Sequence, residues 1–303
     1  MTAIVVRGLT VRYGGRRAAR PALDQVSFEV APGEIVGAVG PNGAGKTSLL
    51  AVLAGERRPT HGLSLIAGER AGTPAARRLV GWAPEPPILP RELTGFEWLY
   101  YLATHRARNP AERASRIREA IELAQIAEFV ERRIGTYSRG MAQRLALAGA
   151  VITGPAVLLL DETLSGIDPL VQRDLREALA VLARRGRAMI VASHDLGTVE
   201  RLATRALVLT RGVLAADVQM HDLLGQRVME LALDGGALAA AAGLCARFPG
   251  AIRTGEGVAV PLERGLTPEQ VLAACRAQRI AVAATRVRYR ALDDLIAATA
   301  RSA

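Results

Sequence analysis

The chain has 303 residues, of which 50% are hydrophobic, 22% charged and 4% aromatic, and its formal net charge is +10. This composition is that of a globular protein, and the length predicts one large domain with a smaller one, or two domains. It excludes a disulfide framework, because the chain has only two cysteines, Cys245 and Cys275, and no metal-ligand spacing surrounds them. All but one of the 39 basic residues are arginine and they form no dense block, so we expect no specific nucleic-acid partner.

The chain shows no segment for secretion or membrane insertion. Residues 1–6 lack a basic stretch followed by an apolar core, and no run approaches the roughly 20 apolar residues that a bilayer-spanning helix needs. We therefore expect no signal peptide and no transmembrane segment. Any work at a membrane would pass through a partner protein.

A strand, a glycine loop and a helix follow one another early in the chain. Residues 34–39 are largely apolar, as in a buried strand, and residues 47–53 are apolar and helix-compatible. Between them, Gly40 to Thr47 matches the phosphate-loop pattern G-x-x-x-x-G-K-[ST] and contains the only lysine, Lys46. Backbone N–H groups at the start of such a helix bind phosphate, the ammonium suits the β- and γ-phosphates, and the Thr47 hydroxyl suits Mg²⁺.

A second helix start with an accessible backbone comes at residues 137–144. Ser138 is a good N-cap, Gly140 leaves the backbone open beside it, and an apolar helical run continues to Ile152. This predicts a second helix N-terminus able to bind a phosphate. A single chain does not need two such sites for the same γ-phosphate. The second site therefore indicates that it acts on the phosphate bound by a neighbouring copy in a dimer.

Two acidic residues end a buried strand predicted at residues 156–162. Carboxylates at the carboxyl edge of a parallel sheet point to the ligand crevice. Asp161 can therefore orient Mg²⁺, and Glu162 can polarise an attacking water as a general base. Taken alone, the pair is equally well interpreted as a solvated acidic turn, and the phosphate loop favours the catalytic interpretation.

These segments together resemble the ATPase subunits of ATP-binding cassette (ABC) transporters over roughly residues 3–224. Residues 40–47 and 156–162 resemble the Walker A and Walker B motifs, and Ser138 to Gln143 falls where the family signature falls. Residues 188–192 form another apolar strand, followed by a Ser-His-Asp segment that resembles the family's switch. Tyr13 resembles the family's adenine-stacking aromatic, and residues 165–168 resemble the loop after Walker B. These six motifs in the family's order are specific, where one would be weak.

The resemblance implies roles for individual residues. Glu162 and His194 would be catalytic, and Thr47, Glu85 and Asp161 would bind Mg²⁺. ATP would be bound by an adenine-stacking aromatic, both phosphate-facing segments and the loop after Walker B: Tyr13, Gly40, Pro41, Asn42, Gly43, Ala44, Gly45, Lys46, Thr47, Ser48, Ser138, Arg139, Gly140, Met141 and Asp168. Three of these have ordinary alternatives: Tyr13 as a strand aromatic, His194 as a core or N-cap residue, and Asp168, before Pro169, as a turn residue or a helix start.

Two positions depart from the family pattern. Glu85 stands where the family usually has a glutamine that reaches Mg²⁺ and water, and Arg139 replaces the first glycine of the usual signature Leu-Ser-Gly-Gly. A carboxylate can still ligate Mg²⁺, and a guanidinium can itself hold phosphate. This combination resembles a subset of exporter ATPases that work with a separate permease protein.

Residues 86–153 are predicted to form a helical subdomain, in which Asn109-Pro110 with Glu112 is a good helix start. Much of the chain's aromatic content lies in one cluster here: Phe96, Trp98, Leu99, Tyr100 and Tyr101. The cluster has two open interpretations. It is either subdomain core or, by the resemblance, a groove for a short helix of the permease.

The tail, residues 225–303, is predicted to be a separate α+β domain. Its pattern indicates a strand at 228–233, a helix at 237–248, a hairpin at 252–260, a helix at 267–278, a strand at 280–290 and a helix at 291–300. This succession predicts a ferredoxin-like sandwich and resembles the accessory domain of many exporter ATPases. Arg286, Arg288 and Arg290 share one strand face and are expected to be solvated, with a regulatory or dimer-contact role as the alternative.

The fold class that we expect is α/β. It comprises a P-loop NTPase of ABC type at residues 1–224, with a mixed sheet core, an antiparallel β subdomain and a helical subdomain, followed by the ferredoxin-like accessory domain. The implied function is an ATP-hydrolysing motor subunit of an exporter, which dimerises around two ATP–Mg²⁺ as a homodimer or as a heterodimer with a related ATPase. It would lie at the cytoplasmic face of the membrane, bound to an integral membrane permease. The alternative is a soluble ABC ATPase linked to ribosomes, DNA or iron–sulfur assembly.

Overall fold

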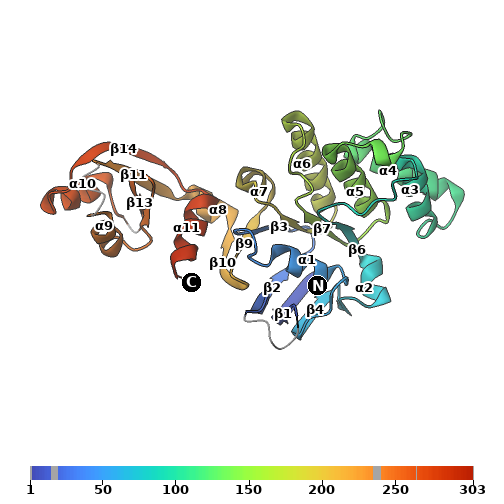
Figure 1. The fold of residues 1–303 in the computed structure, drawn as a ribbon, viewed down its shortest axis with the longest axis horizontal. Coiled ribbons are helices and arrows are strands. Elements are labelled where there is room, and N and C mark those ends of the chain that lie inside the picture. The colour runs from blue at the N-terminus through green and yellow to red at the C-terminus, as the bar shows by residue number, and fades with distance from the viewer. Residues whose placement is uncertain (1, 15–19, 235–239, 264, 303) are drawn as a thin grey trace. The chain divides into compact units, whose positions relative to one another are not determined.

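The computed structural model describes residues 2–14, 20–234, 240–263 and 265–302. They form two compact units, Met1–Asp217 and Val218–Ala303, each with its own strands and helices (Figure 1). The sequence placed the border between residues 224 and 225. The short helix α8 (Met220–Gly225) begins between these two borders and ends one residue beyond the predicted one.

The first unit contains a four-stranded antiparallel sheet in the order β2-β1-β4-β5. In β1, Ile4 and Val6 are fully buried whereas Arg7 is exposed, so this strand has one apolar face. The strands are β1 (Ile4–Val11), β2 (Leu23–Val30), β4 (His61–Ile66) and β5 (Glu69–Arg70).

The second sheet has the order β10-β9-β3-β8-β7-β6, and its strands from β9 to β6 are parallel. They are β3 (Ile35–Val39), β6 (Val80–Ala83), β7 (Val157–Asp161), β8 (Ala188–Ala192) and β9 (Arg205–Thr210), with β10 (Val213–Gln219) at the edge. Every residue of β3, β7 and β8 is buried. Strands buried on both faces are continuous apolar runs, which is why the sequence predicted all three within one residue at either end.

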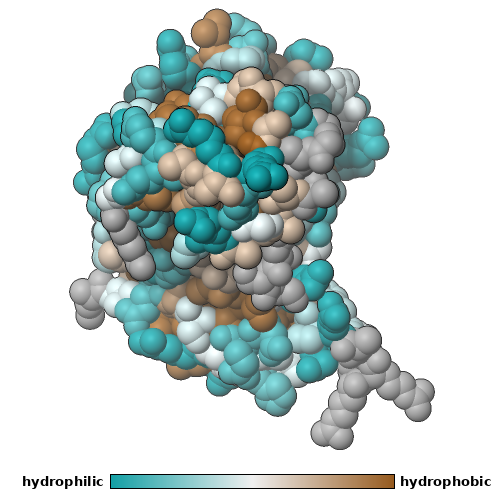
Figure 2. All heavy atoms as spheres, turned by 90° about the vertical axis from the view of Figure 1, so that its left-hand side faces the viewer, coloured by the Kyte–Doolittle hydropathy of each residue, from teal (hydrophilic) through white to brown (hydrophobic). Residues whose placement is uncertain are grey.

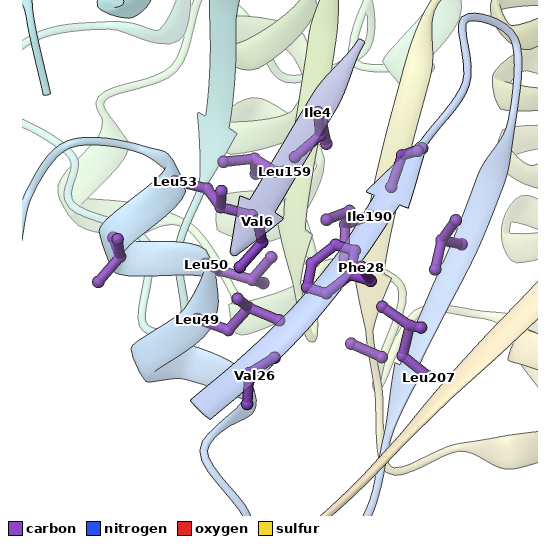
Figure 3. Close-up of a cluster of buried hydrophobic side chains, with 14 of the residues drawn as sticks. Ile4, Val6, Val26, Phe28, Leu49, Leu50, Leu53, Leu159, Ile190 and Leu207 are labelled. Carbon is purple, nitrogen blue, oxygen red and sulfur yellow. The ribbon is translucent and has the colours of Figure 1, made fainter. Parts of the chain in front are cut away.

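The main core contains side chains from both sheets and from α1 (Lys46–Leu53). Leu49, Leu50 and Leu53 of this helix are at most 1% exposed. Figure 3 shows these leucines beside residues of the two sheets: Ile4, Val6, Val26, Phe28, Leu159, Ile190 and Leu207. The glycine loop before α1 is therefore attached at both ends to buried elements. The remaining helices of the sheet layer are α2 (Pro74–Leu79), α6 (Pro169–Arg184) and α7 (Leu196–Leu202).

Three helices make up the helical subdomain, namely α3 (Gly95–Thr104), α4 (Pro110–Ala124) and α5 (Arg139–Ile152). Each begins at a capped position. The side chains of Thr94, Asn109 and Ser138 accept hydrogen bonds from backbone N–H groups three residues further on. The helix starts predicted at Asn109 and Ser138 are confirmed.

The aromatic cluster of this subdomain divides between core and surface. Leu99 is fully buried, and the Trp98 ring lies against Gly149 so closely that a Cβ there would be 2.2 Å from it. In contrast, Tyr100 is 43% and Tyr101 is 59% exposed. The core interpretation therefore holds for Trp98 and Leu99 but not for Tyr100 and Tyr101.

The second unit has the element order β-α-β-β-α-β and a sheet in the order β12-β13-β11-β14, with antiparallel neighbours. This is the arrangement of a ferredoxin-like fold. Its elements are β11 (Arg227–Leu233), α9 (Ala241–Arg247), β12 (Ile252–Arg253), β13 (Gly257–Pro261), α10 (Pro268–Ala277), β14 (Val282–Tyr289) and a final α11 (Leu292–Ser302). The first part of the helix predicted at 237–248 falls on residues 235–239, outside the described residues.

The expectation that Arg286, Arg288 and Arg290 are solvated is wrong for two of them. The Arg288 side chain is 25% exposed, and it donates to Glu230 and to both oxygens of Asp294 at 2.7 Å each. The Arg290 side chain is 12% exposed, whereas Arg286 is exposed. These charges tie β14 to β11 and to α11 within the unit.

In the described part of the chain, no helix is both long and apolar enough to span a bilayer. Figure 2 shows one face of the molecule, on which hydrophilic residues surround patches of hydrophobic ones.

Candidate active site

The loop from Gly40 to Thr47 joins β3 to α1 and takes a shape that requires glycine. Gly40 has φ 145°, and a Cβ there would lie 2.1 Å from the backbone oxygen of Leu209. Gly45 has φ 107°, and its Cβ would lie 2.5 Å from the backbone oxygen of Ala22. The glycines of the motif thus let the backbone turn tightly and present its N–H groups at the start of α1.

Lys46 is buried inside this loop. Its Nζ donates to the backbone oxygen of Gly40 at 2.7 Å and to that of Pro41 at 3.2 Å. Burial lowers the pKa of Lys46, while the nearby Glu162 and Asp161 oppose that change. The ammonium is therefore held in place by the loop it serves, beside two carboxylates.

A cavity of about 370 Å³ lies in front of the loop. It brings together residues from both predicted Walker motifs and from the loop after β6: Ala22, Asn42, Gly43, Ala44, Gly45, Lys46, Thr47, Ser48, Glu85, Asp161 and Glu162. Tyr13, His194, Asp168 and the Ser138-to-Met141 turn, which were also predicted to serve the nucleotide, do not line it.

Asp161 brings an unused oxygen to this cavity. The residue is 2% exposed, and among the described residues its Oδ2 has no hydrogen-bond partner. Burial raises the pKa of Asp161 to about 6, against the hydrogen bond from Thr47. A buried carboxylate oxygen without a donor, beside a threonine hydroxyl, fits a hard cation such as Mg²⁺.

The described residues do not form a complete metal cage. The described residues contain no group of three or more His, Cys, Asp or Glu side chains that could hold a metal ion. Mg²⁺ commonly takes one or two carboxylates and completes its shell with water and phosphate oxygens. The donor set of Thr47 and Asp161 is of this kind.

The structure brings the two predicted catalytic residues into contact. Oε2 of Glu162 lies 2.7 Å from Nδ1 of His194, and Oε1 accepts from the His194 backbone N–H at 2.8 Å. Ser165 donates to Oε2 at 2.5 Å. Glu162 itself has φ 48°, a rare conformation for a residue with a side chain. Ser193 also donates to Oε2, at 3.3 Å. The carboxylate is thus oriented by four groups, of which the roles of Ser165 and Ser193 were missed from sequence.

Glu85 reaches the cavity, but both of its carboxylate oxygens are bonded to α5. Oε1 accepts from Arg139 at 2.8 Å and Oε2 accepts from Gln143 at 3.3 Å. The magnesium role of Glu85 stays a prediction. The contribution of Gln143 carried no separate signal in the sequence.

Tyr13 stands half-exposed near the start of α1. Its hydroxyl lies 3.0 Å from Oγ of Ser48, and the guanidinium carbon of Arg57 lies 3.6 Å from the ring centre. Arg57 also donates to the backbone oxygen of Arg12 at 3.2 Å. The ring is therefore supported from one side and tethered at its hydroxyl.

The two remaining predicted site segments cap helices. Oγ of Ser138 accepts from the Met141 N–H at 3.3 Å, which leaves the N-terminus of α5 ordered and accessible. Oδ1 of Asp168 accepts from the Leu170 N–H at 2.9 Å at the start of α6. Asp168 thus has the capping role that its position before proline also indicated.

The chain is similar in sequence to several known proteins. A family model described as ABC transporter matches residues 23–165. The chain is 37% identical to an uncharacterized ABC transporter ATP-binding protein of a Nostoc species over 68% of its own length and 62% of the relative's. It is 34% identical to the ABC transporter ATP-binding protein YcbN of Bacillus subtilis, over 75% and 73%. It is 32% identical to the Nod factor export ATP-binding protein I of Rhizobium meliloti, over 75% and 67%. The match with the Nostoc relative thus spans less than two thirds of that protein.

Two solved structures share the fold. One, described as the ATP-binding subunit of an ABC transporter, is 28% identical with a TM-score of 0.67, over 73% of this chain and 92% of that one. The other, a dimeric ATP-binding cassette in a post-hydrolysis state with ADP and Pi, is 23% identical with a TM-score of 0.67, over 72% and 98%. The chain therefore belongs to the ABC transporter ATP-binding protein family.

Proposed function

We propose that the chain is the ATP-hydrolysing subunit of an exporter-type ABC transporter. The observation that carries the proposal is the position of Glu162. Its carboxylate follows Asp161 at the carboxyl end of β7, lines the cavity that contains Lys46, and is oriented by His194. A base held at the edge of a phosphate-binding cavity is what hydrolysis of a terminal phosphate requires.

The residues of the chain have separable roles in this reaction. The loop N–H groups and Lys46 bind the phosphates, and Thr47 with Asp161 would hold Mg²⁺, which when bound neutralises charge on the phosphate oxygens. Glu162 accepts the proton of the attacking water as the bond to the γ-phosphorus forms and the bond to the β–γ bridging oxygen breaks. His194 and Ser165 keep that carboxylate in one orientation. Tyr13 is the proposed adenine platform.

The second phosphate-facing helix end supports action as a dimer. The Ser138-to-Met141 turn is capped and accessible but does not line the cavity of its own chain. In the proposed sandwich it faces the nucleotide of the other copy, so that each ATP is held by two chains. The solved relative that is described as dimeric supports the same arrangement. Either two copies or one copy with a related ATPase can form it.

A membrane permease is the proposed partner, with the chain at the cytoplasmic face. An apolar groove of about 500 Å³ lies between α3 and α4 and is lined by Phe96, Tyr100, Ile117 and Ile121 among others. Such a groove can receive a short amphipathic helix. Export is supported by the relative described as a Nod factor export protein and by the Glu85 and Arg139 departures. Co-purification with a polytopic membrane protein tests this part.

The hydrolysis proposal is tested with Glu162→Gln. The amide keeps the shape of the side chain but cannot take a proton, so we expect ATP hydrolysis to fall about 10²- to 10⁴-fold. ATP affinity should stay near that of the wild type, and an ATP-dependent dimer should accumulate in light scattering. Glu177→Gln, at an exposed position of α6, is the matched control. Wild-type hydrolysis by Glu162→Gln would disprove the base assignment.

A further inference from the structure

The two positions that depart from the family pattern contact each other. Glu85 follows β6 and Arg139 begins α5, and although they are 54 residues apart, Nη2 of Arg139 lies 2.8 Å from Oε1 of Glu85. The Arg139 side chain is 65% exposed and that of Glu85 is 26% exposed. The guanidinium thus reaches from solvent to a carboxylate that lines the nucleotide cavity.

Gln143 holds the other oxygen of Glu85. It lies one turn after Arg139 on the same side of α5, and its Nε2 donates to Glu85 and to the backbone oxygen of Glu162 at 3.2 Å. The residue is 1% exposed, and within the described residues its Oε1 has no partner. The two atoms that Nε2 of Gln143 contacts are both hydrogen-bond acceptors. The amide nitrogen must therefore face them, which fixes the orientation of the side-chain amide. Glu85 is therefore held against the catalytic edge of the sheet while Arg139 remains accessible.

This ion pair has a competitor in the dimer. In the proposed sandwich, the turn that contains Arg139 faces the phosphates bound by the other chain. A guanidinium binds phosphate and carboxylate with the same paired N–H geometry, so an exposed arginine can exchange one for the other. The negative charge of Glu85 therefore competes directly with the nucleotide for Arg139.

We propose that Glu85 restrains Arg139 in the free chain, and that Arg139 exchanges this carboxylate for the phosphates of the other chain's ATP as the dimer closes. Glu85 is a positioning residue in this scheme. It sets the ATP concentration at which two chains pair, because the ion pair must open before Arg139 completes the second site. The scheme rests on the proposed dimer.

The restraint is tested first without nucleotide, by amide hydrogen exchange of residues 141–147 in the full chain. Glu85→Gln and Arg139→Gln should each speed exchange severalfold, and the charge swap Glu85→Arg with Arg139→Glu should restore slow exchange. Glu29→Gln breaks another exposed pair, Arg7 with Glu29 on the antiparallel sheet, and should leave this segment unchanged. Unchanged exchange in both single variants would overturn the restraint.

The exchange of Arg139 from the Glu85 carboxylate to the phosphates of the other chain is tested by ATP-dependent dimerisation in the Glu162→Gln background. Glu85→Gln should lower the dimer dissociation constant by up to about 25-fold, since two ion pairs open per dimer and each exposed pair is worth up to about fivefold. Arg139→Gln should raise it. With Arg139→Gln already present, Glu85→Gln should have no further effect.

The outcomes separate the proposal from its premise. An equal gain from Glu85→Gln with and without Arg139 would show a general charge effect in the cavity and refute the exchange. If the Glu162→Gln chain forms no dimer with ATP, the sandwich itself fails, whereas hydrogen exchange still decides whether Glu85 restrains Arg139.

Discussion

Arg57 supports the aromatic ring that is proposed to carry adenine, so its removal tests the nucleotide platform. The guanidinium covers one face of Tyr13 at 3.6 Å and donates to the Arg12 backbone oxygen at 3.2 Å. An aromatic ring has two faces, and the proposal requires that adenine use the other one. Arg57→Met keeps most of the aliphatic stem and removes only the charged, hydrogen-bonding end.

The size of the effect follows from these contacts. A partly desolvated cation–π pair is worth about 0.5–2 kcal/mol, and the hydrogen bond to Arg12 adds about 1 kcal/mol. Part of this support is retained by the 3.0 Å contact between the Tyr13 hydroxyl and Ser48. We therefore expect Arg57→Met to weaken ATP binding by about 1–2 kcal/mol, which is roughly 5- to 30-fold in Kd.

Calorimetric titration with ATP and with inorganic tripolyphosphate separates the contribution of the Tyr13 ring to affinity from that of the phosphate loop. Inorganic tripolyphosphate uses the phosphate loop but has no base, so its affinity should be the same in Arg57→Met and in the wild type. Arg58→Met, at the exposed neighbouring position, should leave both affinities unchanged. Equal losses for ATP and tripolyphosphate would refute the stacking argument. Unchanged or tighter ATP binding would show that Arg57 does not support the adenine face.

Two further changes test the loop and the second unit. Gly45→Ala should destabilise the chain by about 1–3 kcal/mol and abolish ATP binding, because φ 107° and a Cβ 2.5 Å from the Ala22 oxygen are incompatible with a side chain; wild-type-like thermal unfolding and calorimetry would contradict this. Asp294→Asn should destabilise the second unit by about 2–3 kcal/mol, seen as faster amide exchange in β14 with ATP affinity unchanged. Burial raises the pKa of Asp294, but the hydrogen bonds from Arg288 and the Ala291 N–H outweigh it and lower the pKa. This stabilisation is therefore present above the ordinary carboxyl pKa of about 4 and is lost as pH falls through the lowered value. A difference between wild type and Asp294→Asn that does not shrink as the pH falls below the ordinary carboxyl pKa would contradict the charge-based reason.

Local signals in the sequence predicted the structure wherever the stabilising interactions join residues that are close together in the chain. The N-caps Asn109 and Ser138 bond to N–H groups three residues away, and both were predicted. The buried strands before Lys46 and Glu162 are continuous apolar runs, so their type and ends were also predicted. The strand order of the three sheets has no such signal, because it depends on how the connections cross.

By itself, the sequence determined that this chain has a phosphate loop, a buried acidic strand end and a second capped helix start, and with them the family. Only the tertiary structure decided the partners of the charged groups. Glu162 meets His194, 32 residues away, and Glu85 meets Arg139, because parallel strands bring distant loops to one edge of the sheet. The same holds for Arg288, which the strand pattern placed in solvent but which Glu230 and Asp294 bind. A charge has no periodicity of its own, so its partner is set by the packing of the apolar residues around it.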